Sequence, residues 1–444
     1  MVRIPFLRKR SKMAFLIVFG TLVALITLTR IPLGFVMVLC GIGGIALLHP
    51  RGFDAAFSIA EREIVNLAMN EQFATMPLFV MMGVFVVKAG LADDLFGMAQ
   101  RWIGHKRGGL GMATILACGG FAALSGSSTA SAATMAKICV PPMRDADYDE
   151  GFSAAAVAAG GTMGILIPPS GALIVYALLT EESIGELFIA GLVPGLLQLF
   201  LYVIAGGIVA RLFPLWAPAG PVFGWRDRFA ALGKVWGVLA LFAMVMLGLV
   251  FGIFTATEAA GFGAGGAFLF SVARGRMSFG VLAESLREAA RISGMIFLVA
   301  SGALVLNQFV NISGLAGDLV GGISNLGLSP FHVILCLIAF YMVLGCFLDG
   351  FAIIFLTVPV VVPVVAALGY DLVWWGIVTV IIVEISLITP PVGMNVYILK
   401  AMLPKVSIMR IFRGVMPFFV MDMLRLVAIL AFPMIALWLV EFSR

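Results

Sequence analysis

Long runs of apolar residues, separated by short segments that hold glycine, proline or charged residues, follow one another along nearly the whole chain. Ten of these runs approach or exceed the roughly 20 residues that cross a bilayer core. They cover residues 13–29, 31–48, 74–90, 151–180, 184–211, 234–254, 256–273, 293–312, 371–399 and 415–440. The pattern predicts an all-α polytopic membrane protein and leaves no room for a sizeable soluble domain.

Two further apolar regions, residues 109–142 and 330–366, are each too long for one ordinary span. The first is interrupted near its middle by the segment Ser125-Gly126-Ser127-Ser128-Thr129. The second is interrupted by residues 345–350, which include Asp349. We expect each region to form a re-entrant helical hairpin whose tip lies inside the membrane. Non-helical backbone at that depth is tolerated only where protein, water or an ion covers its polar groups.

Double prolines interrupt two of the ten runs. Pro168-Pro169 lies within residues 151–180, and Pro390-Pro391 lies within residues 371–399. Because consecutive prolines remove two backbone donors and clash with the preceding turn, the carbonyl groups before them lose their helical partners. The sequence therefore predicts two broken helices, each with free carbonyl oxygens at the break.

An internal repeat relates the two halves of the chain. Residues 85–97 and 309–321 share Phe-Val, Gly-Leu-Ala, Asp-Leu and Gly at a constant offset of 224 residues. The Tyr-Asp pair at 148–149 and the double proline at 168–169 both reappear 222 residues later. Five predicted crossings lie between equivalent points, and an odd number inverts the second copy in the membrane. This is the arrangement of many secondary transporters.

The repeat sets the expected domain organisation. Residues 1–213 form the first inverted repeat, residues 214–233 a cytoplasmic linker, and residues 234–444 the second inverted repeat. Each repeat then contains one hairpin, at about 109–142 or 330–366, and one broken helix, at about 151–180 or 371–399.

The composition agrees with a membrane protein and narrows its chemistry. Of the 444 residues, 62% are hydrophobic and 11% are charged, compared with about 25% charged in an ordinary soluble domain. Lys and Arg gather beside the first hairpin and in three later loops, which the positive-inside rule assigns to the cytoplasm. The net charge of +5 therefore faces membrane lipid, and no nucleic-acid partner is expected.

The sequence offers little support for an enzymatic activity or a transition-metal site. The five cysteines and three histidines are scattered, so we expect neither a disulfide framework nor a transition-metal site. The chain has no Walker motif and no nucleophile with a neighbouring base. We expect a protein without enzymatic activity or cofactor, whose energy comes from an ion gradient.

Oxygen-rich segments at the hairpin tips and helix breaks predict two sodium sites, since hard cations bind several oxygen ligands. The first site would combine the serine-rich tip with carbonyl groups near Gly164. The second would combine the tip from Gly345 to Gly350, including Asp349, with Thr389. In the alternative, the breaks are plain proline kinks and the serines bond back to their own helix.

Four ionisable residues of the apolar regions carry specific expectations. A carboxylate inside the membrane costs at least about 2.5 kcal/mol on insertion scales, so Asp349 is interpreted as an ion ligand or proton carrier. Its alternative role is the N-cap of a helix that begins at Gly350. Glu384 would support the second sodium site or pair with a base. Asp422 and Arg425, three residues apart, predict an intramembrane salt bridge with no transport role.

A series of short motifs is spread over nearly the whole chain. They are Arg107-Gly108-Gly109-Leu110, Ser125-Gly126-Ser127-Ser128, Pro141-Pro142-Met143, Ile167-Pro168-Pro169-Ser170, Ser183-Ile184-Gly185-Glu186-Leu187-Phe188, Ala190-Gly191, Pro194-Gly195, Thr257-Glu258-Ala259 and Ile388-Thr389-Pro390-Pro391-Val392-Gly393. Together they resemble the large membrane subunit, the M subunit, of tripartite ATP-independent periplasmic (TRAP) transporters.

The resemblance implies an elevator-type transporter of the bacterial or archaeal inner membrane. The hairpins and broken helices would form its moving transport domain, and residues 13–48, 184–254 and 415–440 its scaffold. Sodium as coupling ion would drive uptake of an organic acid such as a dicarboxylate, sialic acid or a keto acid. Two partners are implied: a periplasmic substrate-binding protein, and a small four-span membrane subunit, expected on a separate chain because four extra spans are not found here.

The resemblance also implies site residues at the tips and breaks. Expected sodium contacts are Ser125, Gly126, Ser127, Gly164, Pro168, Gly345, Asp349, Thr389 and Gly393. Expected substrate contacts are Ser127, Ser128, Thr129, Ser170 and Gly350. Two alternative functions stay open: a stand-alone sodium-coupled carboxylate carrier of the same broad superfamily, and an ion antiporter in which Asp349 exchanges the ion.

Overall fold

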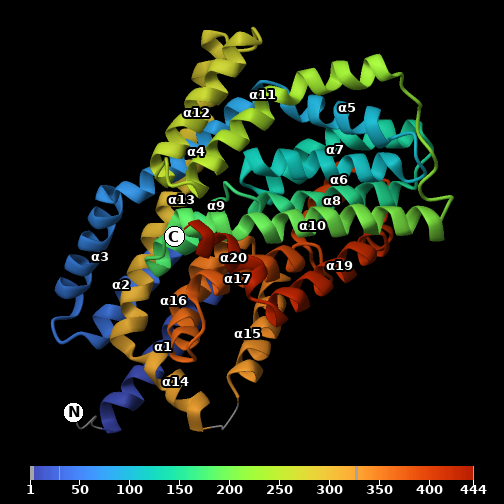
Figure 1. Ribbon diagram of the computed structural model, residues 1–444. Helices are drawn as coiled ribbons and strands as arrows, with labels where there is room; N and C mark the ends of the chain where they lie inside the picture. Colours follow the sequence, from blue (N-terminus) through green and yellow to red (C-terminus); the bar gives the residue numbers. More distant parts are fainter. Residues whose placement is uncertain (1–4, 30, 326–328, 444) are drawn as a thin grey trace.

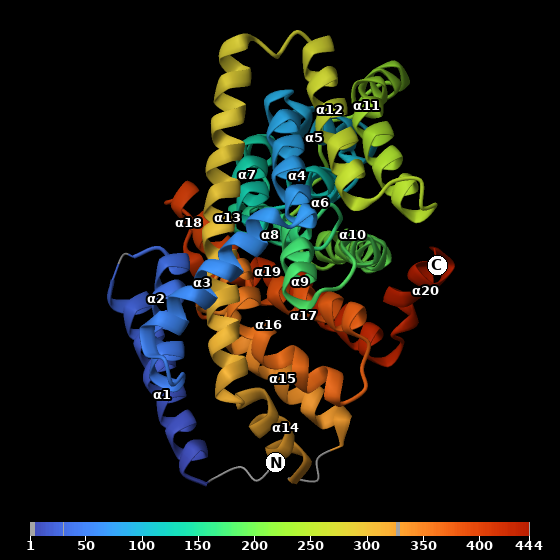
Figure 2. The same cartoon turned by 90° about the vertical axis from the view of Figure 1, so that its left-hand side faces the viewer.

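The computed structural model describes residues 5–29, 31–325 and 329–443, and the regular secondary structure within these ranges is helical. One isolated β-bridge, between Arg107 and Ala219, joins two loops there. The predicted all-α fold is confirmed. Figures 1 and 2 show two groups of helices, one around the long helix α13 (Phe279–Ser313) and one that contains the hairpins and broken helices.

The first group packs along α13. It consists of α1 (Pro5–Leu28), α2 (Leu33–Leu48), α3 (Gly52–Met69) and α4 (Glu71–Lys88), and α12 (Ala256–Ala273) joins the group through its packing on α4. Helices α2 and α13 approach so closely that a Cβ atom at Gly302 would lie 2.5 Å from the carbonyl oxygen of Gly34. Small residues allow such an approach between apolar helices. Helix α4 lies beside both α12 and α13 (Figure 2).

The second group contains two helical hairpins. In the first, α6 (Gly109–Ser125) and α7 (Ser128–Asp145) are separated only by Gly126 and Ser127. Gly126 has a φ of 61°, a left-handed conformation that ends α6 without steric cost. In the second, residues 346–349 separate α15 (Pro330–Gly345) from α16 (Gly350–Ala367). We call these two non-helical turns, with the residues that flank them, the first and second tips.

Each double proline separates two helical segments. Helix α8 (Glu150–Thr162) continues into a 3₁₀ turn (Met163–Ile165), and α9 (Gly171–Thr180) begins after the prolines. Helix α17 (Leu372–Ser386) ends before the second double proline, and α18 (Met394–Met402) begins after it. Both double prolines contain a cis peptide bond. We call these two interruptions the first and second breaks.

Equivalent residues of the two sequence copies have the same local structure. Gly90 and Gly314 have φ angles of 72° and 69°, and each precedes a short amphipathic helix, α5 (Leu91–Ile103) or α14 (Leu315–Asn325). Asp149 and Asp371 each begin a broken helix by accepting a hydrogen bond from the N–H three residues later, at 2.9 and 2.8 Å. The inversion of the copies in the membrane and their outer boundaries stay predictions.

Five helices of the described ranges are long and apolar enough to cross a membrane by length and composition, namely α4, α10 (Ile184–Leu212), α13, α16 and α19 (Ile408–Ala431). Helix α11 (Trp225–Val250) adds a sixth when its two segments, bent by 45°, are counted as one span. Other predicted runs form shorter apolar helices, among them α2 and α17. The chain is therefore a multi-pass membrane protein.

Four details differ from the expectations. Helix α3 was not predicted, because charged residues interrupt its apolar pattern. Its buried face consists of Ala55, Ala56, Ala60 and Leu67. The linker expected at 214–233 is shorter, since α11 begins at Trp225 with Asp227 in its first turn. The run expected at 415–440 is two helices, α19 and α20 (Met434–Ser443), because Pro433 cannot continue α19.

The fourth difference concerns helices expected in the scaffold. Helix α19 packs against α8 and α17, and α10 packs against α6 and α17. Both helices therefore lie with the hairpins and broken helices, and not with α1 and α2. Helix α11, from the same expected scaffold region, packs against α5 and α12.

Candidate functional site

The first tip packs against the first break. A Cβ atom at Gly164 would lie 2.9 Å from the carbonyl oxygen of Ser127, and one at Gly126 would lie 3.3 Å from the carbonyl oxygen of Pro169. The Ser170 hydroxyl donates a hydrogen bond to the carbonyl oxygen of Ile165, which the double proline has left without its helical donor. Backbone oxygens of the tip and of the break are therefore neighbours.

The second tip packs against the second break in the same way. Gly345 leaves no room for a Cβ atom beside the Ser386 side chain. The Cys346 thiol lies 3.4 Å from the carbonyl oxygen of Pro390, to which it donates a hydrogen bond. Each hairpin is thus seated on the broken helix of its own half of the sequence.

Contacts also join the two halves of the sequence. Asn395, at the start of α18, donates hydrogen bonds to the Ser128 hydroxyl at 2.7 Å and to the carbonyl oxygen of Ala158 at 3.1 Å. Gly171, at the start of α9, lies against the ring of Phe351 at the start of α16. Each tip therefore contacts the second segment of the other half's broken helix.

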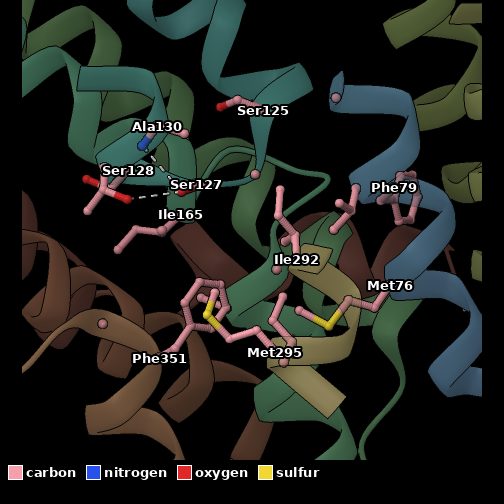
Figure 3. Close-up of a pocket in the computed structure, with 18 of the residues that line it drawn as sticks. Met76, Phe79, Ser125, Ser127, Ser128, Ala130, Ile165, Ile292, Met295 and Phe351 are labelled. Carbon is pink, nitrogen blue, oxygen red and sulfur yellow. Dashed lines mark hydrogen bonds between the residues drawn. The ribbon is translucent and has the colours of Figure 1, made fainter. Parts of the chain in front are cut away.

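A cavity of about 630 Å³ lies where the two tips meet (Figure 3). One wall is polar and comes from the tips: Ser125, Gly126, Ser127, Ser128, Thr129, Asp349 and Gly350. The opposite wall comes from α4 and α13 and is apolar apart from Glu288: Met76, Phe79, Val80, Val84, Ile292, Met295, Ile296 and Val299. In the part of the chain that the structure describes, no Lys, Arg or His side chain lines this cavity.

Three helices begin at the polar wall. Ser127 caps α7 by accepting a hydrogen bond from Ala130 N–H, and Ser170 caps α9 by accepting one from Leu173 N–H at 3.3 Å. The Asp349 carboxylate caps α16 by accepting from Phe351 N–H at 3.0 Å and from Ala352 N–H at 3.1 Å. A helix N-terminus carries partial positive charge, so the three helix ends add positive potential at the polar wall, and the Asp349 carboxylate opposes it.

The structure divides the expected site residues into two sets. Seven line the cavity, at the tips: Ser125, Gly126, Ser127, Ser128, Thr129, Asp349 and Gly350. Six do not line it and lie behind or beside the tips: Gly164, Pro168, Ser170, Gly345, Thr389 and Gly393. Most of the second set are buried. Their roles as sodium or substrate contacts stay predictions.

Oxygen atoms dominate both tip–break pairs, which suits a hard cation. At the first, the Ser125 and Ser131 hydroxyls are 2.5 Å apart, and Ser127 presents its carbonyl toward Gly164. At the second, the Thr389 hydroxyl donates to the carbonyl oxygen of Ile385 at 2.6 Å, which leaves its lone pairs free. These oxygen donors are of the kind that sodium prefers, and sodium binding at the two tip–break pairs stays a prediction.

The structure shows the surroundings of the three acidic residues singled out in the apolar regions. Asp349 is the N-cap of α16 and also lines the cavity, so the cap and an ion-binding role are compatible. Glu384 pairs with Arg425 at 2.8 Å and does not line the cavity. The predicted salt bridge between Asp422 and Arg425 is confirmed, with a distance of 3.0 Å.

Sequence reasoning missed two contributions to this region. Asn395 was not singled out, although it is the only amide side chain in the short apolar segment 394–402. The apolar wall was not predicted either, because α4 and α13 read as ordinary spans and nothing in their pattern says which face meets the tips. Both contributions depend on contacts between residues far apart in sequence.

Comparison with known proteins agrees with this architecture. The family model for the tripartite ATP-independent periplasmic transporter, DctM component, matches residues 19–435. The C4-dicarboxylate TRAP transporter large permease protein DctM of Pseudomonas aeruginosa is 37% identical over 327 residues, which are 73% of this chain and 76% of the relative. Its counterpart in Vibrio cholerae is 30% identical over 421 residues, with 90% and 92% of the two chains covered.

Solved structures support the fold alone, because their sequence identity is low. The YdaH transporter of Alcanivorax borkumensis has a TM-score of 0.65 at 13% identity, with 89% of this chain and 90% of that chain covered. MtrF of Neisseria gonorrhoeae has a TM-score of 0.57 at 13% identity, with 88% and 85% covered. From the match over residues 19–435 and these relatives, the chain belongs to the DctM family, the large permease components of TRAP transporters.

Proposed function

We propose that this protein is the membrane permease of a sodium-driven transporter that takes up an organic acid across the bacterial or archaeal inner membrane. The cavity between the two tips carries the proposal. It combines a polar wall, at which three helix N-termini lie, with backbone and hydroxyl oxygens where each tip packs on its break. Sodium bound by these oxygens would hold the tips in place and add positive charge beside the substrate carboxylate.

The cavity favours a carboxylate as the anchoring group. Three helix N-termini and the Ser127, Ser128 and Thr129 side chains offer donors to an anion. Asp349 and Glu288 also line the cavity. Lys88 forms an ion pair with Glu288 at 3.7 Å, whereas no ion pair of the described residues involves Asp349. The Asp349 charge would repel an anion unless sodium is bound beside it, which is a physical reason for coupling the two.

Two partners complete the proposed system. We infer a periplasmic substrate-binding protein that delivers the organic acid, and a small four-span membrane subunit. The isethionate TRAP transporter permease protein DctMQ of Oleidesulfovibrio alaskensis supports the second partner, since this chain covers only 51% of it and its name joins the M and Q components. The relatives' names place them in tripartite systems.

The packing supports an elevator-type movement. Hairpins, broken helices, α10 and α19 contact one another closely and would move as one transport domain. The apolar wall from α4 and α13 offers few polar groups to hold the tips, so the tips could slide along it. Helices α1 to α4, α12 and α13 would form the static part.

The decisive experiment is uptake of labelled organic acids into proteoliposomes that contain this chain and its small membrane partner. We expect uptake only with an inward sodium gradient and with the cognate binding protein present. Uptake of free substrate without the binding protein would favour the stand-alone carrier. Sodium–proton exchange without uptake of any organic acid would favour the antiporter.

A further inference from the structure

A cluster of buried charges lies outside the cavity, where α10, α17 and α19 pack against one another. Arg425 of α19 contacts the Glu384 carboxylate of α17 at 2.8 Å and the Asp422 carboxylate of its own helix at 3.0 Å. The exposed fractions of these three side chains are 0%, 0% and 1%. The cluster is therefore removed from water as well as from the proposed substrate.

The charges in this cluster do not balance. Two carboxylates and one guanidinium sum to one negative charge when all three are ionised. The neighbours on the packed helices are neutral: Thr162 of α8, Gln198 and Tyr202 of α10. An uncompensated charge in an apolar interior is so costly that a group takes up or releases a proton instead.

The contacts of the two carboxyl groups differ. Asp422 Oδ2 accepts a hydrogen bond from the Tyr202 hydroxyl at 2.5 Å, and its Oδ1 lies 3.0 Å from the Arg425 guanidinium in an ion pair that lacks hydrogen-bond geometry. Glu384 has one oxygen on Arg425, and its Oε1 has no hydrogen-bond partner among the described residues. Gln198 faces this carboxyl group, and its Oε1 likewise lacks a donor there. A proton on Glu384 Oε1 would supply that donor.

We propose that this cluster is a proton-binding site, in which Glu384 carries one proton while Arg425 and Asp422 stay ionised. The protonated cluster is neutral. A polar chain runs from Thr162, directly before the first break, through Gln198, Tyr202, Asp422 and Arg425 to Glu384 on α17, which leads into the second break. With the proton on Glu384, this chain joins the two broken helices without an uncompensated buried charge.

Infrared spectroscopy of the purified full-length protein tests the proposal directly. A protonated carboxyl group has a carbonyl stretching band that a carboxylate lacks. We expect this band at neutral pH in the wild type, its loss in Glu384→Gln, and its retention in Glu61→Gln, a matched control at an exposed glutamate of α3. Absence of the band from the wild type, or its persistence in Glu384→Gln, would overturn the proposal.

The amide of Glu384→Gln also mimics the neutral acid. This variant should fold and take up substrate within about twofold of the wild-type rate. If it fails to fold while Glu61→Gln folds, a negative charge is needed at position 384, and the proposal is wrong. In Asp422→Asn, Glu384 becomes the counter-ion of Arg425 and releases its proton. The band should then disappear although Glu384 is intact, and its survival in folded Asp422→Asn protein would contradict the assignment.

Thermal unfolding gives a second, independent measurement. The folded protein binds a proton that the unfolded chain releases at neutral pH, so the wild-type unfolding temperature should fall as pH rises. This part of the pH dependence should be absent from Glu384→Gln and present in Glu61→Gln. Equal pH dependence in wild type and Glu384→Gln would count against the site. Neither measurement requires the substrate or the binding protein.

Discussion

Single side chains at the tips combine a helix cap with the proposed binding site, and variants can separate the two roles. Ser127→Ala removes the cap of α7, which costs about 0.5–2 kcal/mol of stability, together with a hydroxyl at the cavity. Ser278→Ala is the matched control, since Ser278 caps α13 at an exposed position by accepting a hydrogen bond from Val281 N–H.

We expect both serine variants to lose a similar amount of stability in thermal unfolding. Only Ser127→Ala should lose sodium-dependent uptake. Equal uptake by the two variants would show that the Ser127 hydroxyl has no role beyond the cap.

Asp349→Asn separates charge from capping at the second tip. Asparagine caps a helix about as well as aspartate, so the folded structure and stability should be preserved. We expect the variant to require a much higher sodium concentration for half-maximal uptake, because a negative ligand has been removed. An unchanged sodium requirement would exclude Asp349 as a sodium ligand.

Asn395 joins the two halves of the molecule through one side chain. Asn395→Ala removes the donor to Ser128 and to the carbonyl oxygen of Ala158, which should cost about 1–3 kcal/mol because both acceptors are buried. Asn311→Ala, at an exposed position in α13, should change stability by less than about 0.5 kcal/mol. Chemical denaturation in detergent compares them. A neutral Asn395→Ala would mean that the tips do not depend on this contact.

At the scale of helices, the close packing of α2 on α13 lets us predict how substitutions of glycine in α13 change stability. Gly302→Val places a branched side chain against the backbone of Gly34, so overpacking should cost about 1–3 kcal/mol or separate the helices. Gly294→Ala in the same helix meets no atom within 4 Å and should stabilise the protein by up to about 1 kcal/mol. Thermal unfolding of both variants checks this, and similar shifts in the same direction would contradict the packing.

The helix breaks could be predicted from the sequence because their cause is local. Consecutive prolines cannot donate to the preceding turn, and the structure ends α17 before Pro390. Helix α3 was missed for the opposite reason, because its short buried face is recognisable only once the partner helix is known. The true start of α11 was missed because its first turns are charged and largely exposed, so they continue no apolar run.

At the scale of the whole molecule, sodium binding should order the tips and leave the first group of helices unchanged. Hydrogen exchange in the full complex should show increased protection of residues 125–130 and 345–350 when sodium replaces potassium. The helices α1 to α3 serve as the internal control, with no change expected. Protection that changes equally in both regions would indicate a general stabilisation and not two sodium sites at the tips.

The sequence by itself determined the helical membrane fold, the two interrupted hairpins and the family, because hydrophobic run length, proline chemistry and motif spacing are properties of short segments. Only the tertiary structure decided that Asn395 holds Ser128, that α4 and α13 supply an apolar wall, and that Glu384 joins Asp422 and Arg425 instead of the second tip. These contacts join residues that are distant in the sequence. The pattern of a single sequence does not show which distant segments pack against one another.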